Sequence, residues 1–159
     1  MSLRPEDTDP TKWHRYFAME CNNRAWQLAT QSRTPDEDLE MLNAAHASAL
    51  HWAPMGAELN DMRARTLLAE VHALLGYGAS ALNFANAARS YFLARETEDW
   101  ELAYAHAIHA HAAAVAGENQ LHTESYAAAV HAIDAIADEE DRKIVLQTFE
   151  QVPPPGGSS

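Results

Sequence analysis

The sequence is poor in the residues that build disulfides, strands and basic surfaces. Of its 159 residues only Cys21 is a cysteine, which excludes an intramolecular disulfide. Isoleucines (four) and valines (five) are few, and because β-branched residues favour strands, a sheet protein is disfavoured. Eleven lysines and arginines stand against 23 acidic residues, a formal net charge of −12. Such a charge repels phosphate backbones and anionic lipids, so we expect no nucleic-acid and no membrane partner.

Long apolar runs are also missing. The longest stretches are rich in alanine and interrupted by histidine, so none is suited to span a membrane. The N-terminus lacks a basic segment followed by an apolar run, the pattern of a secretory signal, and we therefore expect a cytoplasmic protein. Phosphate-binding loops, nucleophile elbows and zinc-protease helices do not occur in the sequence. These features favour a non-catalytic protein without a cofactor.

Alanine is what the chain has in abundance. Its 32 alanines, together with apolar residues recurring at spacings of three and four, predict an all-α protein of about seven helices. We expect a single domain over residues 10–150, built of three helix pairs and a capping helix, over about 10–53, 55–95, 97–137 and 139–150. Residues 1–9 are expected to be flexible and residues 151–159, rich in proline and glycine, to form a disordered tail.

Helix start signals support this division. Asp9 before Pro10 predicts a capped start, and the apolar spacing that follows predicts a helix to about residue 32. Thr34 and Glu37 have the spacing of a capping box, in which each residue satisfies the backbone N–H of the other. Three further helix starts are predicted, at Thr97, Asn119 and Asp138.

The turns inside the helix pairs recur at a fixed distance. Pro35, Gly76 and Gly117 are 41 residues apart in each step. A fixed period of this size indicates units that stack on one another, because a single helix pair cannot bury both of its apolar faces.

Matching places in the units are occupied mostly by alanine. They are Leu68, Ala69, Ala81, Ala85 and Ala88 in the second unit, and Ala110, Tyr126 and Ala129 in the third. In this pattern, over about residues 13–137 and with Pro54 near the end of the first unit, the chain resembles the tetratricopeptide-repeat (TPR) family. The resemblance implies antiparallel helix hairpins stacked as a short right-handed α-solenoid. A generic α-solenoid, or a helical bundle built from hairpins, would give the same alanine pattern.

In the TPR family, the first helix of each pair lines a concave groove that binds a protein or peptide. Carried over by position, the groove residues would be Asn22, Ala25, Ala29, Arg63, Thr66, Glu70, Tyr104, Ala107 and His111. The polar members, Asn22, Arg63, Thr66, Glu70, Tyr104 and His111, are the candidate partner-binding surface. They do not form the lysine- and asparagine-rich clamp that some TPR proteins use for a peptide carboxylate. The acidic net charge favours a partner with basic character.

Histidine is frequent, with nine in the chain. His106 and His109 lie three residues apart on one predicted helix, so they share a face and are the candidate metal ligands. Because zinc sites need three or four ligands, Glu70, His72 or His131 would have to complete the set. The alternative interpretation is polar filler on partly buried, alanine-rich helices.

The sequence therefore favours a non-enzymatic adaptor or scaffold that binds a protein or peptide in a helical groove. Two alternatives stay open. One is a metal-binding helical-bundle enzyme or sensor that uses histidines. The other is a purely structural homo-oligomer such as a homodimer, for which an exposed aromatic face on the first helix would supply the contact.

Overall fold

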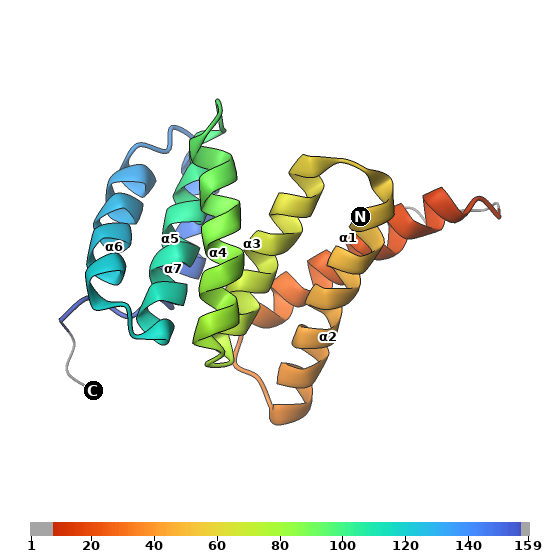
Figure 1. The fold of residues 1–159 in the computed structure, drawn as a ribbon, viewed down its shortest axis with the longest axis horizontal. Coiled ribbons are helices and arrows are strands. Elements are labelled where there is room, and N and C mark those ends of the chain that lie inside the picture. The colour runs from red at the N-terminus through yellow and green to blue at the C-terminus, as the bar shows by residue number, and fades with distance from the viewer. Residues whose placement is uncertain (1–7, 157–159) are drawn as a thin grey trace.

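The structure is a computed structural model that describes residues 8–156. Within this range all regular structure is helical, which confirms the expected all-α class (Figure 1). The elements are α1 (Pro10–Ala29), α2 (Pro35–Trp52), a short 3-10 helix η1 (Ala53–Met55), α3 (Glu58–Leu74), α4 (Gly78–Leu93), α5 (Asp99–Ala116), α6 (Asn119–Asp134) and α7 (Glu139–Phe149). Most of residues 1–9, expected to be flexible, lie outside the described range, as do residues 157–159.

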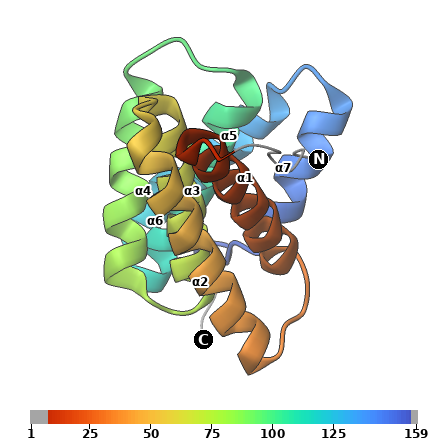
Figure 2. The same cartoon turned by 90° about the vertical axis from the view of Figure 1, so that its right-hand side faces the viewer.

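Neighbouring helices in the sequence also pack against each other in space. The pairs α1–α2, α3–α4 and α5–α6 form hairpins, and α2 contacts α3 as α4 contacts α5. Figure 2 shows α1 and α2 lying side by side at one end of the molecule. A second set of contacts joins α1 to α3, α3 to α5 and α5 to α7. One face of the molecule is therefore built by the odd-numbered helices.

Three of the predicted helix starts are confirmed by side-chain caps. The Asp9 carboxylate accepts a hydrogen bond from the first turn of α1, and the Asp138 carboxylate accepts two from α7. Thr34 and Glu37 form the capping box of α2. Thr97 does not cap α5: its hydroxyl donates to the Phe92 carbonyl, 2.7 Å away, at the end of α4. The threonine thus gives a hydrogen bond to a backbone carbonyl in the last turn of α4, and does not accept one from the N–H groups in the first turn of α5.

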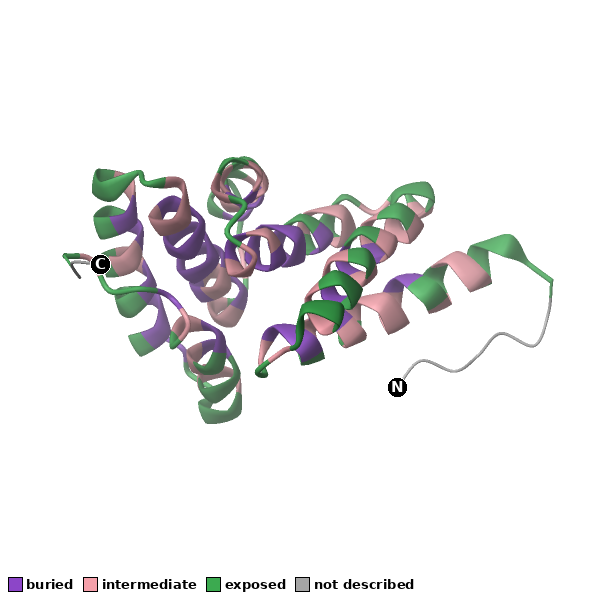
Figure 3. Cartoon of the chain, turned by 90° about the horizontal axis from the view of Figure 1, so that it is seen from below, coloured by how far each residue is buried: buried purple, intermediate pink, exposed green. Residues whose placement is uncertain are grey.

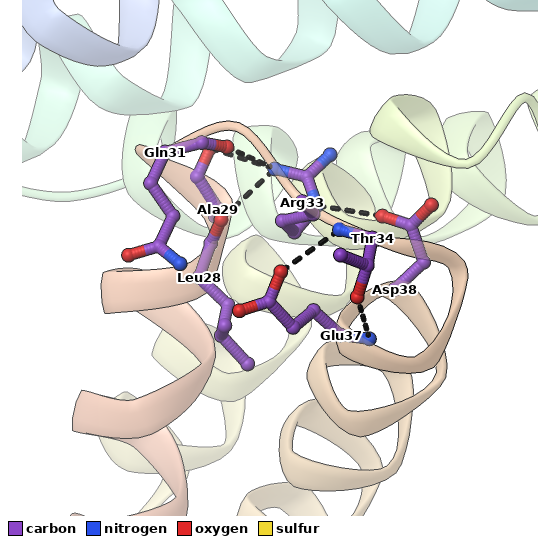
Figure 4. A network of polar contacts seen from close by, with 7 residues as sticks. All are labelled: Leu28, Ala29, Gln31, Arg33, Thr34, Glu37 and Asp38. Atoms are coloured by element: carbon purple, nitrogen blue, oxygen red, sulfur yellow. Dashed lines mark hydrogen bonds and ion pairs between the residues drawn. The ribbon is translucent and has the colours of Figure 1, made fainter.

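The connection from α1 to α2 explains why the first helix ends earlier than predicted. The guanidinium of Arg33 turns back and donates from Nη1 to the Leu28 carbonyl in the last turn of α1, at 2.9 Å. Its Nε donates to Asp38 on α2, at 2.7 Å, while the Thr34–Glu37 box holds the start of α2 (Figure 4). A single arginine thereby links the C-terminal carbonyls of α1 to an acidic residue of α2.

The core is made largely of alanine. Buried residues, purple in Figure 3, lie on the helix sides that face other helices. Their small size permits close approach, and at Gly78 the helices α4 and α5 come so close that a Cβ would lie 2.7 Å from the backbone of Ala116. The helix α5 contacts α3, α4, α6 and α7, and its buried residues include three histidines and a glutamate. The centre of the fold is therefore unusually polar.

The prediction that residues 151–159 form a disordered tail is wrong for the first part of that segment. Val152 is 4% exposed, and the carbonyl of Pro153 accepts a hydrogen bond from Nε2 of His122 on α6, at 2.7 Å. A buried valine side chain and one partly buried hydrogen bond thus hold the segment after α7 against the helices, despite its prolines.

Candidate functional site

The face built by the odd-numbered helices contains a cleft of about 640 Å³. Side chains from α1, α3, α5 and α7 line it, with one further residue from the end of α4. The lining residues are Asn22, Asn23, Trp26, Gln27, Thr30, Arg63, Thr66, Phe92, Trp100, Glu101, Tyr104, Asp141, Ile144, Val145 and Gln147.

Four of the six predicted groove residues line this cleft. Asn22, Arg63, Thr66 and Tyr104 come from three different helices and are brought together there. The TPR resemblance, carried over position by position, was the signal that pointed to them, and their sequence positions differ by multiples of 41 or by one helical turn. The 41-residue register thus places side chains of α1, α3 and α5 around one hollow.

The other two predicted groove residues do not line the cleft. Glu70 is fully buried and His111 is 5% exposed, and Nδ1 of His111 lies 3.1 Å from Oε2 of Glu70. The two side chains are paired inside the protein through Oε2, while Oε1 of Glu70 is buried without a hydrogen-bond partner. Burial removes both residues from a partner-binding surface. This corrects the assignment of Glu70 and His111.

Aromatic rings form the apolar part of the cleft. The ring centroid of Tyr104 lies 5.6 Å from that of Trp26 and 6.2 Å from that of Trp100, the latter in an edge-to-face arrangement. The Tyr104 hydroxyl donates to the Ile144 carbonyl on α7, at 3.4 Å. Burial raises the pKa of this phenol. The sequence does not point to Trp26 and Trp100, because spacing alone does not distinguish a ring in the core from a ring at a cleft.

The charged floor of the cleft is an ion pair between α3 and α5. Arg63 donates to both carboxylate oxygens of Glu101, from Nε at 2.6 Å and from one Nη at 3.0 Å. Glu101 is 6% exposed, and the Arg63 guanidinium also lies 5.7 Å from the ring of Trp100. The hydrogen bond to Glu101 raises the pKa of Arg63. The positive charge of Arg63 is therefore already matched.

A second hollow of about 690 Å³ adjoins the cleft and shares Arg63, Phe92 and Glu101 with it. Its other arginine, Arg95, stacks over Tyr91 with 3.3 Å between guanidinium and ring centre and is paired with a glutamate of α3. Among the described residues, three carboxylates at the two hollows have no hydrogen-bonding or ionic partner: Glu96, Glu98 and Asp141. The charges that have no ionic partner at this surface are therefore negative.

The candidate metal ligands lie elsewhere, in a buried network between α4, α5 and α6. His109 is 1% exposed; its Nε2 donates to Asn86, at 2.7 Å, and its Nδ1 accepts from Ser125, at 2.7 Å, and from Arg89, at 3.3 Å. Burial, and then the charge of Arg89, lower the pKa of His106 and of His109 to about 4. In residues 8–156 no three metal-ligating side chains converge, so His106 and His109 lack the third ligand that a zinc site requires.

No helix of the described chain is both long and apolar enough to cross a membrane. Comparison with protein-family models, curated proteins and solved structures finds no match to this chain. The function is therefore argued from the cleft itself.

Proposed function

We propose that this protein is a non-catalytic binding module that takes a basic peptide segment of another protein in the cleft between α1, α3, α5 and α7. The proposal includes the finer description of the fold as a short, TPR-like α-solenoid. The contacts of α1 with α3, α3 with α5 and α5 with α7 support it, since the first helices of stacked hairpins meet in this order.

The observation that carries the proposal is the charge of the cleft and of the hollow that adjoins it: Asp141 lines the cleft, and Glu96 and Glu98 line the hollow. Both arginines at the two hollows are engaged by glutamates, whereas Glu96, Glu98 and Asp141 are unpaired. A carboxylate or phosphate ligand would meet no free cation here. A lysine or arginine side chain would meet unpaired carboxylates, so the electrostatic complement of this surface is positive.

The other lining side chains suit a peptide. Trp26, Trp100 and Tyr104 offer an apolar site of the kind that anchors an aliphatic or aromatic side chain. Asn22 and Gln147 stand on opposite helices, and amide side chains both donate and accept, as a peptide backbone requires. The expected ligand is thus an apolar residue close to one or more basic residues.

Selection from a random-peptide library displayed on phage tests this proposal. The variant Ile144→Lys places a positive charge at the cleft on a side chain that is 54% exposed, so the core is left unchanged. Val130→Lys on α6, at a residue 41% exposed and outside the cleft, is the matched control. We expect enriched peptides to pair a lysine or arginine with an aromatic or aliphatic residue, and to bind the control variant as they bind the unaltered protein.

Binding to Ile144→Lys should fall at least tenfold, and binding to the unaltered protein should weaken as salt is added. Selection of acidic peptides would contradict the proposed ligand class. Equal binding to Ile144→Lys and to the unaltered protein would place the binding surface elsewhere.

A further inference from the structure

Two histidines from neighbouring helices meet at the surface, away from the cleft. His46 lies on α2 and His72 on α3, 26 residues apart in the sequence, and their Nε2 atoms are 3.0 Å apart. His46 is exposed, whereas His72 is half-buried between the rings of Tyr77 and Phe84, with centroids at 5.7 and 5.3 Å. One imidazole is thus held in place and the other is free to adjust.

One arrangement of the hydrogen bonds around His72, the one that suits metal binding, places the imidazole proton on Nδ1. The Ser80 hydroxyl donates its one hydrogen to the Tyr77 carbonyl, at 3.2 Å. The same oxygen lies 2.6 Å from Nδ1 of His72, so it accepts from Nδ1–H. A neutral imidazole with its proton on Nδ1 carries a lone pair on Nε2, and that lone pair points toward His46.

This is the arrangement of a metal-ligating histidine. Such residues donate their second ring N–H to a fixed acceptor, which orients the ring and sets the tautomer. Metal–imidazole bonds of about 2.0–2.1 Å separate two adjacent ligand nitrogens by about 2.9 Å at a right angle and about 3.3 Å at a tetrahedral angle. The observed 3.0 Å falls within this range.

We propose that His46 and His72 form a two-imidazole site for a divalent transition metal ion, with water in the remaining positions. Among the described side chains no third ligand converges on the pair, so the site is open. The separation near that of a right angle, together with two nitrogen donors, favours Cu²⁺ over Ni²⁺ and Zn²⁺. The bound ion would join α2 to α3, and therefore the first hairpin to the second. The site is independent of the cleft.

A second histidine pair serves as an internal comparison. His14 on α1 and His51 on α2 have their Nδ1 atoms 2.9 Å apart. In the described part of the chain, no hydrogen bond fixes the other nitrogen of either ring. Since neither tautomer is set by a second partner, we expect this pair to bind more weakly than His46 and His72.

Titration of the full-length protein with Cu²⁺ at neutral pH, followed by calorimetry and by electron paramagnetic resonance, tests the proposal. The unaltered protein should bind one ion most tightly and show hyperfine coupling to two nitrogens. His46→Gln keeps an amide N–H that can donate to Nε2 of His72 but removes the ligand, at an exposed position where the fold is preserved. It should weaken the tight site at least tenfold, and Ser80→Ala, which releases the His72 tautomer, should weaken it about tenfold.

His51→Gln is the matched control and should leave the tight site unchanged. Added Cu²⁺ should raise the melting temperature of the unaltered protein and of His51→Gln, but not that of His46→Gln. Equal Cu²⁺ affinity of His46→Gln and the unaltered protein would overturn the proposal, as would loss of the tight site in His51→Gln. Absence of copper-nitrogen coupling in the unaltered protein would also overturn it.

Discussion

Mild acid should lower the free energy of unfolding of this protein, because two buried histidines take up protons when the chain unfolds. His106 and His109 have pKa values of about 4 in the folded chain, because burial and the charge of Arg89 disfavour the imidazolium. In the unfolded chain each returns to its ordinary value of about 6.5. The unfolded state therefore binds more protons between these values. Stability is full above about pH 6.5, falls as the pH drops toward 4, and levels off below it.

The magnitude follows from the size of the shift. Each histidine should remove about 2 kcal/mol from the free energy of unfolding between pH 7 and pH 5, hence about 4 kcal/mol for the two. The structure gives the local reason for His109. Its Nδ1 accepts from Ser125 and from Arg89, so protonation turns an acceptor into a donor and places two positive charges side by side.

Urea denaturation followed by circular dichroism at pH 7, 6 and 5 measures this effect. His106→Gln removes one of the two titrating groups and should halve the loss of unfolding free energy. His131→Gln, at an exposed position of α6, is the control and should retain the full loss. Since His72 also has a lowered pKa, it adds a change of the same sign to every variant and cancels in the comparison. The reasoning is refuted if the free energy of unfolding of the unaltered protein falls by less than about 1 kcal/mol between pH 7 and pH 5. It is also refuted if this fall is as large in His106→Gln as in the unaltered protein.

Two further predictions concern the packing of single residues. Gly78→Ala should lower the free energy of unfolding by about 1–3 kcal/mol, because the new Cβ would lie 2.7 Å from the Ala116 backbone. Thermal denaturation measures this change. An unchanged melting temperature would show that α4 and α5 can separate without a loss of stability. Val152→Asp should lower the free energy of unfolding by about 2–3 kcal/mol, because it buries a carboxylate. Val130→Asp, at a residue 41% exposed, should lower it little. Equal melting temperatures for the two variants would mean that the segment after α7 does not pack against the helices.

Much of the helical framework could be predicted from local chemistry. Asp9, Thr34 and Asp138 cap the helices that the sequence assigns to them, because an N-cap needs only a side-chain oxygen and the two or three residues that follow. Thr97 shows where this reasoning ends. An N-cap of α5 would accept from N–H groups at the start of that helix, but the Thr97 hydroxyl donates to the Phe92 carbonyl at the end of α4. The path of the loop decides between these two partners.

The cleft was predicted in part, for a similar reason. The TPR resemblance, aligned on a spacing of 41 residues, places Asn22, Arg63 and Tyr104 at equivalent positions on successive odd-numbered helices, and all three line the cleft. The same spacing put Glu70 and His111 on that surface. They differ because both are buried between the helices, where Nδ1 of His111 pairs with Oε2 of Glu70.

The sequence by itself determined the class of the fold, the number of helices, most of their starts and the sign of the surface charge. These properties depend on composition and on residues within one or two turns of each other. Only the tertiary structure decided that Arg63 is neutralised by Glu101, that Val152 is buried, and that His46 faces His72. Such contacts join residues up to 38 positions apart, and they depend on how helices rotate and approach, which local propensity does not specify.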